Sequence, residues 1–199
     1  MIKCKKFILI GLLSSFILGQ SHVGGQPLSR NNSIDYIDRI VMETFDLDAM
    51  IAEDESRSFG KTRYGKVFDV DFSSDSNGIW ETLDDGSKIW RLMINSPNAY
   101  SIGVSFADLV LPEGSRLYAY SSDYTELKGG YTSFNNSIHF STPLLIGDSI
   151  IIEYNSNAES NQLPNINIVE IIHDYKDIFN TILDRNCGIN VACSDADPY

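Results

Sequence analysis

Two cysteines near the end of the chain are the residues whose type and spacing say most about chemistry. Cys187 and Cys193 flank the sequence Gly-Ile-Asn-Val-Ala and share one parity with Ile189 and Val191. In an extended segment their Cα atoms lie about 20 Å apart, whereas a disulfide needs about 4.4 to 6.8 Å. The economical interpretation is that their partners lie in sequence that this chain does not contain. A tight loop joining the two is the alternative.

The histidines do not predict a hydrolytic site, because a Ser-His-Asp site needs an oriented histidine beside an activated serine. The chain has three histidines, and none is followed by the cysteine that marks a trypsin-type histidine. His22 lies in a polar leader, and His139 lies in a strand-like segment. His173 precedes Asp174; a polarised pair is the alternative, and we interpret the two residues as an exposed strand end. We therefore predict no peptidase activity for this chain alone and assign no catalytic residue.

Two further motifs are better explained as turns. The run Asp75-x-Asn77-Gly78 faintly resembles a calcium loop, but Ser73 stands in the first ligand position and Asp84 replaces the bidentate glutamate. Gly147-Asp-Ser149 resembles part of a trypsin-type serine motif, but isoleucine follows it. Since no His and Cys spacing suggests zinc, the sequence predicts neither a metal nor a cofactor.

Alternating apolar residues predict the elements that surround these positions. Period-two patterns occur in residues 67–72, 89–94, 102–106, 117–120, 150–154 and 166–175. Turn residues separate the segments, for example Asp84-Asp-Gly86, Pro112-Glu-Gly114 and Gly129-Gly130. Short strands at this spacing are typical of an antiparallel sandwich. We therefore expect a mainly β, jelly-roll-like antiparallel β-sandwich with one or two short N-terminal helices.

The N-terminal helices are predicted from two weaker patterns. Residues 46–55 combine acidic residues in the first turn with helix-forming residues, which favours a short helix. Ile34, Ile37, Ile40 and Val41 fall on one helical face after Ser33, but this segment equally fits a short extended stretch. Residues 20–32 are polar and rich in glycine, and we interpret them as a flexible leader.

Composition limits the partners of the chain. Its 199 residues suffice for one domain of ordinary size. Fifteen Lys and Arg against 27 Asp and Glu give a net charge of -12. Because phosphate neutralisation needs a basic surface, a nucleic-acid partner is not expected. An acidic surface also works against anionic membranes.

The first residues predict export. Lys3, Lys5 and Lys6 precede an apolar run from Phe7 to Leu18, which is too short for a membrane span and is followed by polar sequence. This pattern predicts a cleaved signal peptide over residues 1–19, with the cut between Gly19 and Gln20. We therefore expect a secreted, extracellular protein that makes no membrane contact after cleavage.

The chain also carries a resemblance that covers roughly residues 46 to 199. It is similar to the propeptide and mature N-terminus of secreted bacterial trypsin-like serine proteases of the lysyl endopeptidase type. The patterns that carry the resemblance are Ala52-Glu-Asp54, Arg63-Tyr-Gly65, Trp90-Arg-Leu92, Ser96-Pro-Asn-Ala-Tyr-Ser101, Leu111-Pro-Glu-Gly-Ser-Arg-Leu-Tyr118, Gly147-Asp-Ser-Ile-Ile-Ile-Glu153 and Cys187-Gly-Ile-Asn-Val-Ala-Cys193.

The resemblance implies a function for each part of the chain. Residues 20–45 would be a leader, 46–176 the propeptide sandwich, 177–186 a connector, and 187–199 the truncated start of the protease domain. In that family both cysteines bond to cysteines further along the catalytic domain. That catalytic domain is the partner expected in cis for the propeptide sandwich. Arg185-Asn186 is the candidate processing bond. The family would more usually imply a cut after lysine, and the nearest is Lys176, so both sites stay open.

The implied function is that of a folding assistant and inhibitor for a secreted serine endopeptidase. A free-standing secreted sandwich that acts as a binding or adhesion module is the alternative. Exposed tyrosines would then form a face for stacking sugars; the candidates are Tyr118, Tyr120, Tyr124 and Tyr131. Two unpartnered thiols favour the propeptide over the binding module.

Overall fold

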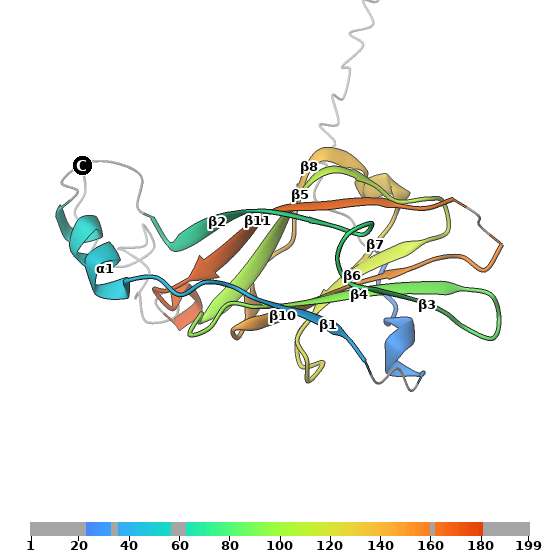
Figure 1. Ribbon diagram of the computed structural model, residues 1–199, viewed down its shortest axis with the longest axis horizontal. Helices are drawn as coiled ribbons and strands as arrows, with labels where there is room; N and C mark the ends of the chain where they lie inside the picture. Colours follow the sequence, from blue (N-terminus) through green and yellow to red (C-terminus); the bar gives the residue numbers. More distant parts are fainter. Residues whose placement is uncertain (1–22, 33–35, 57–62, 160–161, 181–199) are drawn as a thin grey trace, which may run out of the picture.

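The protein is a β-sandwich in the computed structural model, which describes residues 23–32, 36–56, 63–159 and 162–180. Two sheets pack face to face, as Figure 1 shows. Within the described residues the first sheet has six strands, in the order β1-β4-β10-β6-β7 with β3 also paired to β4. The second has five, in the order β2-β11-β5-β8 with β9 also paired to β5. The mainly β sandwich predicted from the sequence is confirmed.

The first sheet is formed by β1 (Asp38–Val41), β3 (Ile79–Thr82), β4 (Lys88–Asn95), β6 (Arg116–Tyr120), β7 (Leu127–Tyr131) and β10 (Ser149–Asn155). The second sheet is formed by β2 (Gly65–Ser73), β5 (Ser101–Val110), β8 (Ser137–Ser141), β9 (Leu145–Ile146) and β11 (Asn165–Asp174). The helical elements are η1 (Leu28–Arg30), α1 (Leu47–Ser56) and η2 (Ser133–Asn135). From β4 onward the chain repeatedly crosses between the two sheets.

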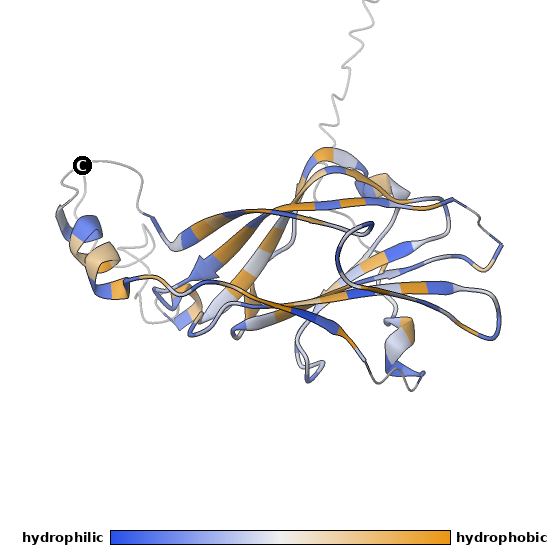
Figure 2. Ribbon diagram, viewed as in Figure 1, coloured by the Kyte–Doolittle hydropathy of each residue, from blue (hydrophilic) through white to orange (hydrophobic). Residues whose placement is uncertain are grey.

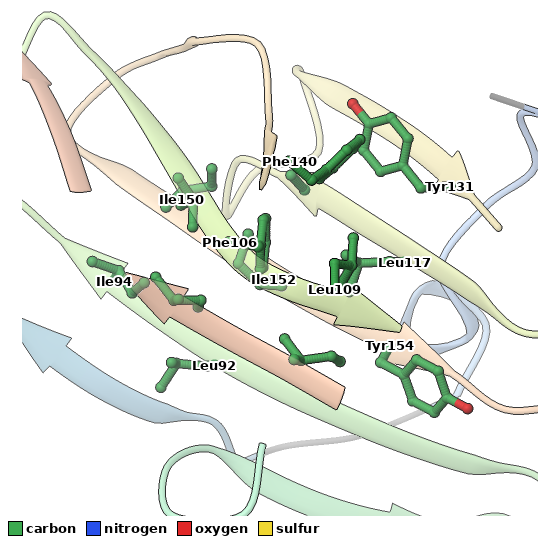
Figure 3. Close-up of a cluster of buried hydrophobic side chains, with 14 of the residues drawn as sticks. Leu92, Ile94, Phe106, Leu109, Leu117, Tyr131, Phe140, Ile150, Ile152 and Tyr154 are labelled. Carbon is green, nitrogen blue, oxygen red and sulfur yellow. The ribbon is translucent and has the colours of Figure 1, made fainter. Parts of the chain in front are cut away.

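The core lies between the sheets and is built from the alternating residues. Leu92 and Ile94 of β4 pair with Ile152 and Ile150 of β10, and all four are buried. Phe106 of β5 packs into the same cluster from the other sheet, and Figure 3 shows these side chains gathered in the interior. Full burial of each aliphatic side chain contributes about 1.5–3 kcal/mol, so this interior stabilises the sandwich.

The edges follow the predicted patterns closely. In β2, Phe68, Val70 and Phe72 pack against the core, whereas Asp69 and Asp71 face outward. Charges on an edge strand discourage pairing with another chain. The turn predicted at Asp84-Asp-Gly86 is confirmed, because it joins β3 to β4 and these strands pair antiparallel. Figure 2 shows the resulting alternation of hydrophobic and hydrophilic residues along the strands.

The helix expected over residues 46–55 is confirmed as α1, and the ambiguous segment before it is extended at its end. Asp46 caps α1, because its side chain accepts the Ala49 N–H at 2.9 Å. Asp38–Val41 forms β1, which pairs in parallel with β4 from Asp38↔Leu92 to Val41↔Asn95. This parallel pair departs from the antiparallel expectation. Pairing with β4 decided the extended conformation of Asp38–Val41, which the local sequence had left open.

Candidate functional site

Six of the predicted processing and disulfide residues lie outside the described residues: Gly19, Gln20, Arg185, Asn186, Cys187 and Cys193. Lys176, the alternative processing residue, is described and lies just after β11. Two of the histidines lie within the described residues. His139 is exposed on β8, and His173 is buried on β11. The candidate site is therefore built from the place where the described chain approaches those residues. We call it the exit end: the last residues of β11, the segment 175–180 and α1.

His173 and Asp174 are not an exposed strand end, and that interpretation is wrong. Their exposed fractions are 3% and 0%. Ser96 Oγ lies 2.7 Å from His173 Nδ1, and the Phe45 ring meets the imidazole edge to face with centroids 5.0 Å apart. The sequence could not show this, because Phe45 belongs to the segment between β1 and α1, far along the chain from β11.

Asp174 directs the chain as it leaves the sandwich. Its carboxylate accepts the Ser101 hydroxyl at 2.8 Å, the Lys176 N–H at 2.8 Å and the Ile178 N–H at 3.1 Å. These bonds wrap the chain into a turn in which Asp177 has a φ of 51°. Because this carboxylate orients backbone and a serine rather than the imidazole, the geometry is structural and is not the relay of a Ser-His-Asp site.

A second set of polar residues ties α1 to the end of β11, and we call it the clasp: Asp54, Arg63, Tyr175 and Lys176. Asp54 accepts the Tyr175 hydroxyl at 2.6 Å and pairs with Lys176 Nζ at 2.6 Å. Arg63 pairs with the other oxygen of Asp54 at 2.9 Å. The hydrogen bond from Lys176, then those from Tyr175 and Arg63, hold the pKa of Asp54 well below its usual range. The clasp therefore stays charged at any ordinary pH.

The clasp matters because α1 has little else to hold it. None of its ten residues is buried, and Leu47 and Ile51 are 39% and 38% exposed. A helix in a globular protein normally buries an apolar stripe against the core. Figure 1 shows α1 standing beside the end of β11, at the opposite end of the molecule from η1. The exit end thus presents a helix on which, among the described residues, Leu47 and Ile51 stay exposed and Met50 is only partly buried.

A pocket of about 350 Å³ opens next to the clasp. Its lining residues are Met50, Arg63, Tyr64, Gly65, Lys66, Val67 and Ile172. Lys66 Nζ lies 4.9 Å from the centroid of the Phe68 ring. Arg63 is already paired with Asp54 and Glu53, so Lys66 is the cationic group that the pocket offers to an acidic or amphipathic side chain of a partner. In the sequence this pocket was marked only by Arg63, Lys66 and the apolar residues near them. A local pattern does not predict that Met50 and Ile172 complete its lining.

The opposite end of the molecule carries a different polar network, which the sequence analysis missed. We call residues 23–32 the strap, because they lie across the outer face of the first sheet. Val23 N–H donates to Gly130 O at 3.1 Å. Ser29 donates through both its N–H and its hydroxyl to the buried carboxylate of Glu153. The expected flexible leader is therefore attached to the sheet within these residues.

The strap and its surroundings also change the interpretation of the tyrosines. Tyr118, Tyr120 and Tyr131 are buried, so they do not form an exposed face for stacking sugars. Tyr120 donates to Glu153 at 2.6 Å and stacks on Tyr124 with centroids 4.8 Å apart. Burial, then the charge of Glu153, raises the pKa of Tyr120. Tyr131 faces the interior between the sheets, where burial raises its pKa to about 12.

The calcium-like segment is a turn, as expected. Asn77 turns its side-chain oxygen back to the Ser73 N–H at 3.1 Å, and its own N–H bonds Ser73 O at 2.9 Å. Across residues 23–32, 36–56, 63–159 and 162–180, no group of three or more His, Cys, Asp or Glu could hold a metal ion. In the same residues no helix has the length and apolar character to cross a membrane.

The pKa of His173 predicts how the exit end responds to acid. Burial lowers this pKa below its ordinary value of about 6.5, and Lys66 lowers it further against the opposing charge of Asp174. The unfolded chain therefore takes up a proton first as pH falls, so stability is complete above about pH 6.5 and declines below it. We expect urea midpoints to fall between pH 7 and pH 5, and to fall less in His173→Asn. An equal decline in both proteins would contradict this assignment.

The fold and the exit end together define a β-sandwich domain with a clasped, exposed helix at the point where the chain departs. The chain matches no protein-family model. Its function is therefore inferred from the sequence patterns and the geometry described above.

Proposed function

We propose that the sandwich is the propeptide of a secreted trypsin-like serine endopeptidase, and that Cys187 begins the catalytic domain. The observation that carries this proposal is the exit end. There the chain leaves the fold beside a helix with no buried residue and a pocket with a cationic rim. A domain that follows the connector would meet, next to its own tether, a surface that the described residues leave exposed.

The length of the connector supports this arrangement. Eleven residue steps separate Lys176 from Cys187, and an extended chain spans at most about 3.6 Å per residue. The catalytic domain would therefore begin within about 40 Å of the clasp. A short tether of this kind gives an effective concentration in the millimolar range. A modest interface on α1 and the pocket is then sufficient to hold the two domains together in cis.

The mechanism of assistance is thermodynamic. A domain that binds the native protease and not its unfolded chain stabilises the native state in proportion to its affinity. Leu47 and Ile51 of α1 supply apolar contact, and the pocket between Arg63 and Lys66 supplies charge for an acidic side chain. The same contact keeps the protease covered until the connector is cut. After cleavage the effective concentration disappears, and the two parts separate.

The proposal includes export and oxidation. Residues 1–19 direct the chain out of the cytoplasm and into an oxidising compartment, in which disulfides form. Cys187 and Cys193 then pair with cysteines further along the catalytic domain, and Arg185-Asn186 is the candidate processing bond. The chain of residues 20–199 has no peptidase activity of its own in this proposal. Turnover of a lysyl or arginyl peptide by the purified chain would overturn that expectation.

The experiment begins with the nucleotides that follow the codon for Tyr199. If the frame, or one restored by a single frameshift, encodes a His-Cys and a Gly-Asp-Ser-Gly, the restored precursor is expressed with and without residues 20–176. We expect omission of these residues to lower the yield of active protease at least about 100-fold, and separately added sandwich to restore part of it. Equal yields with and without them would reject the proposal, as would unrelated downstream sequence together with a Cys187–Cys193 disulfide.

A further inference from the structure

Lys176 is held at both its side chain and its backbone. Its Nζ pairs with Asp54 at 2.6 Å and lies 5.5 Å from the centroid of the Tyr175 ring. Its N–H donates to the buried carboxylate of Asp174 at 2.8 Å. Among the described residues beyond β11, Lys176 is the one basic side chain. It is therefore the point at which a trypsin-type enzyme would attack this part of the chain.

The residues after Lys176 are folded back rather than extended. Asp177 has a φ of 51°, a left-handed conformation that is uncommon for a residue with a side chain. Ile178 N–H returns to Asp174 at 3.1 Å, and Asn180 donates to the side chain of Asp177 at 2.8 Å. An endopeptidase cuts chain that has opened locally, so the rate of cleavage follows the population of the open form. These bonds keep that population low.

We propose that the clasp is a gate that protects the Lys176–Asp177 peptide bond, the alternative processing site implied by the resemblance. With the clasp closed, the ion pair with Asp54 keeps the Lys176 side chain from entering the specificity pocket of an attacking endopeptidase. Asp174 holds the following backbone in a turn. When α1 moves away from β11, the lysine and the scissile bond are released together. A partner protein that contacts α1 would control the gate. A contact that pulls α1 away from β11 would open it, and a contact that presses α1 onto β11 would reinforce it.

The covalent step is ordinary hydrolysis by a separate trypsin-type endopeptidase. One water is added across the Lys176–Asp177 bond, which leaves a carboxylate on Lys176 and an amine on Asp177. The biological use of this gate rests on the proposed propeptide function, because cleavage here would cut the tether between the sandwich and a catalytic domain. The gate itself is a property of the described chain and can be tested without that domain.

The test exposes the exported chain, residues 20–199, to a lysine-specific endopeptidase and follows the product ending at Lys176 by mass spectrometry. Asp54→Asn removes the charge that holds Lys176, Arg63 and Tyr175. We expect it to raise the rate of cleavage after Lys176 about tenfold or more over the wild type. Glu53→Gln is the matched control, because it alters the neighbouring acid of the same helix, which pairs with Arg63 at 2.9 Å.

Circular dichroism and cleavage after Lys128 keep the result interpretable. Lys128 lies on β7 and pairs with Glu126 at 3.0 Å, far from the clasp. Faster cleavage of Asp54→Asn at Lys176, with Lys128 cut at the wild-type rate, supports the gate. If Asp54→Asn loses its fold, Tyr175→Phe replaces it, because this change removes one hydrogen bond to Asp54 and is expected to accelerate cleavage a few-fold.

Two results would overturn the gate. The first is cleavage after Lys176 in the wild type that is as fast as in the denatured chain. The second is an Asp54 variant that is cut no faster than Glu53→Gln. Neither result bears on the proposed propeptide function, which depends on the yield of active protease from the restored precursor. Conversely, the gate would remain supported if the cleavage rates respond as expected but the sequence after Tyr199 encodes no protease. The propeptide function would then be rejected on its own.

Discussion

Replacing Trp90 by alanine is expected to lower the free energy of unfolding by about 4 kcal/mol. Trp90 is 0% exposed and belongs to the main core on β4. Its Nε1–H also donates to Asn77 O at 2.8 Å, which ties the turn after β2 to the interior. Alanine would leave a large cavity between the sheets and an unpaired carbonyl in the turn. Urea unfolding followed by circular dichroism measures the loss.

Trp80 provides the matched control for this prediction. It is the direct cross-strand partner of Trp90 on β3, yet it is 36% exposed. It donates to Ser74 O at 2.8 Å and meets Tyr154 edge to face. Trp80→Ala is expected to cost about 1 kcal/mol, as is usual for a partly exposed residue. Equal losses for the two tryptophans would mean that the interior is not packed as the structure shows.

Replacing Glu153 by alanine is expected to release the strap and to lower the free energy of unfolding by about 3 kcal/mol. The fully buried carboxylate is the common acceptor for Ser29, Tyr120 and Asn155. Hydrogen bonds to a charged group contribute more than neutral ones, and their loss leaves several buried donors without an acceptor. Hydrogen exchange at the Leu28 and Ser29 amides, together with urea unfolding, measures both effects.

An exposed acid tests whether the effect belongs to this network. Glu126→Ala removes a surface ion pair with Lys128 and is expected to change stability by less than about 1 kcal/mol. In Glu153→Ala the amides of the strap should exchange freely, while those of β4 and β10 keep their protection. Retained protection at Leu28 would show that the strap is held by contacts other than Glu153.

Within the exit end, acid should act through His173 before it acts on the clasp. The stability that neutral His173 contributes declines as pH falls below about 6.5, because the unfolded chain takes up a proton first. Asp54 keeps its charge far below its ordinary pKa of about 3.9, because Lys176, Tyr175 and Arg63 favour the ionised form. The clasp therefore outlasts the destabilisation caused by His173, and the two groups respond to separate ranges of pH.

Much of the sandwich was predictable because strand periodicity is a local property. The alternation in residues 67–72 separated Phe68 and Val70 from Asp69 and Asp71, and the structure buries the first pair more than the second. The turn chemistry between residues 84 and 86 likewise placed the β3–β4 hairpin. α1 was predictable from its N-terminal acids, including the cap Asp46. Each of these signals involves neighbours within a few residues.

The exit end was not predictable from local sequence, because its contacts join distant parts of the chain. Asp54 meets Tyr175 across 121 positions, and Ser96 meets His173 across 77. A histidine followed by an aspartate at the end of a strand pattern has the same local appearance whether solvent or Phe45 covers it. Only the path of the segment before α1 decided that both residues are buried.

The sequence by itself determined which residues belong to strands and where the turns lie. The tertiary structure alone decided what covers the outer faces: the strap over Glu153, the clasp beside α1 and the pocket between Arg63 and Lys66. The physical reason is that periodicity reports two faces of a strand without naming the segment that packs on either. That choice depends on contacts between segments more than 100 positions apart, which form only when the sheets assemble.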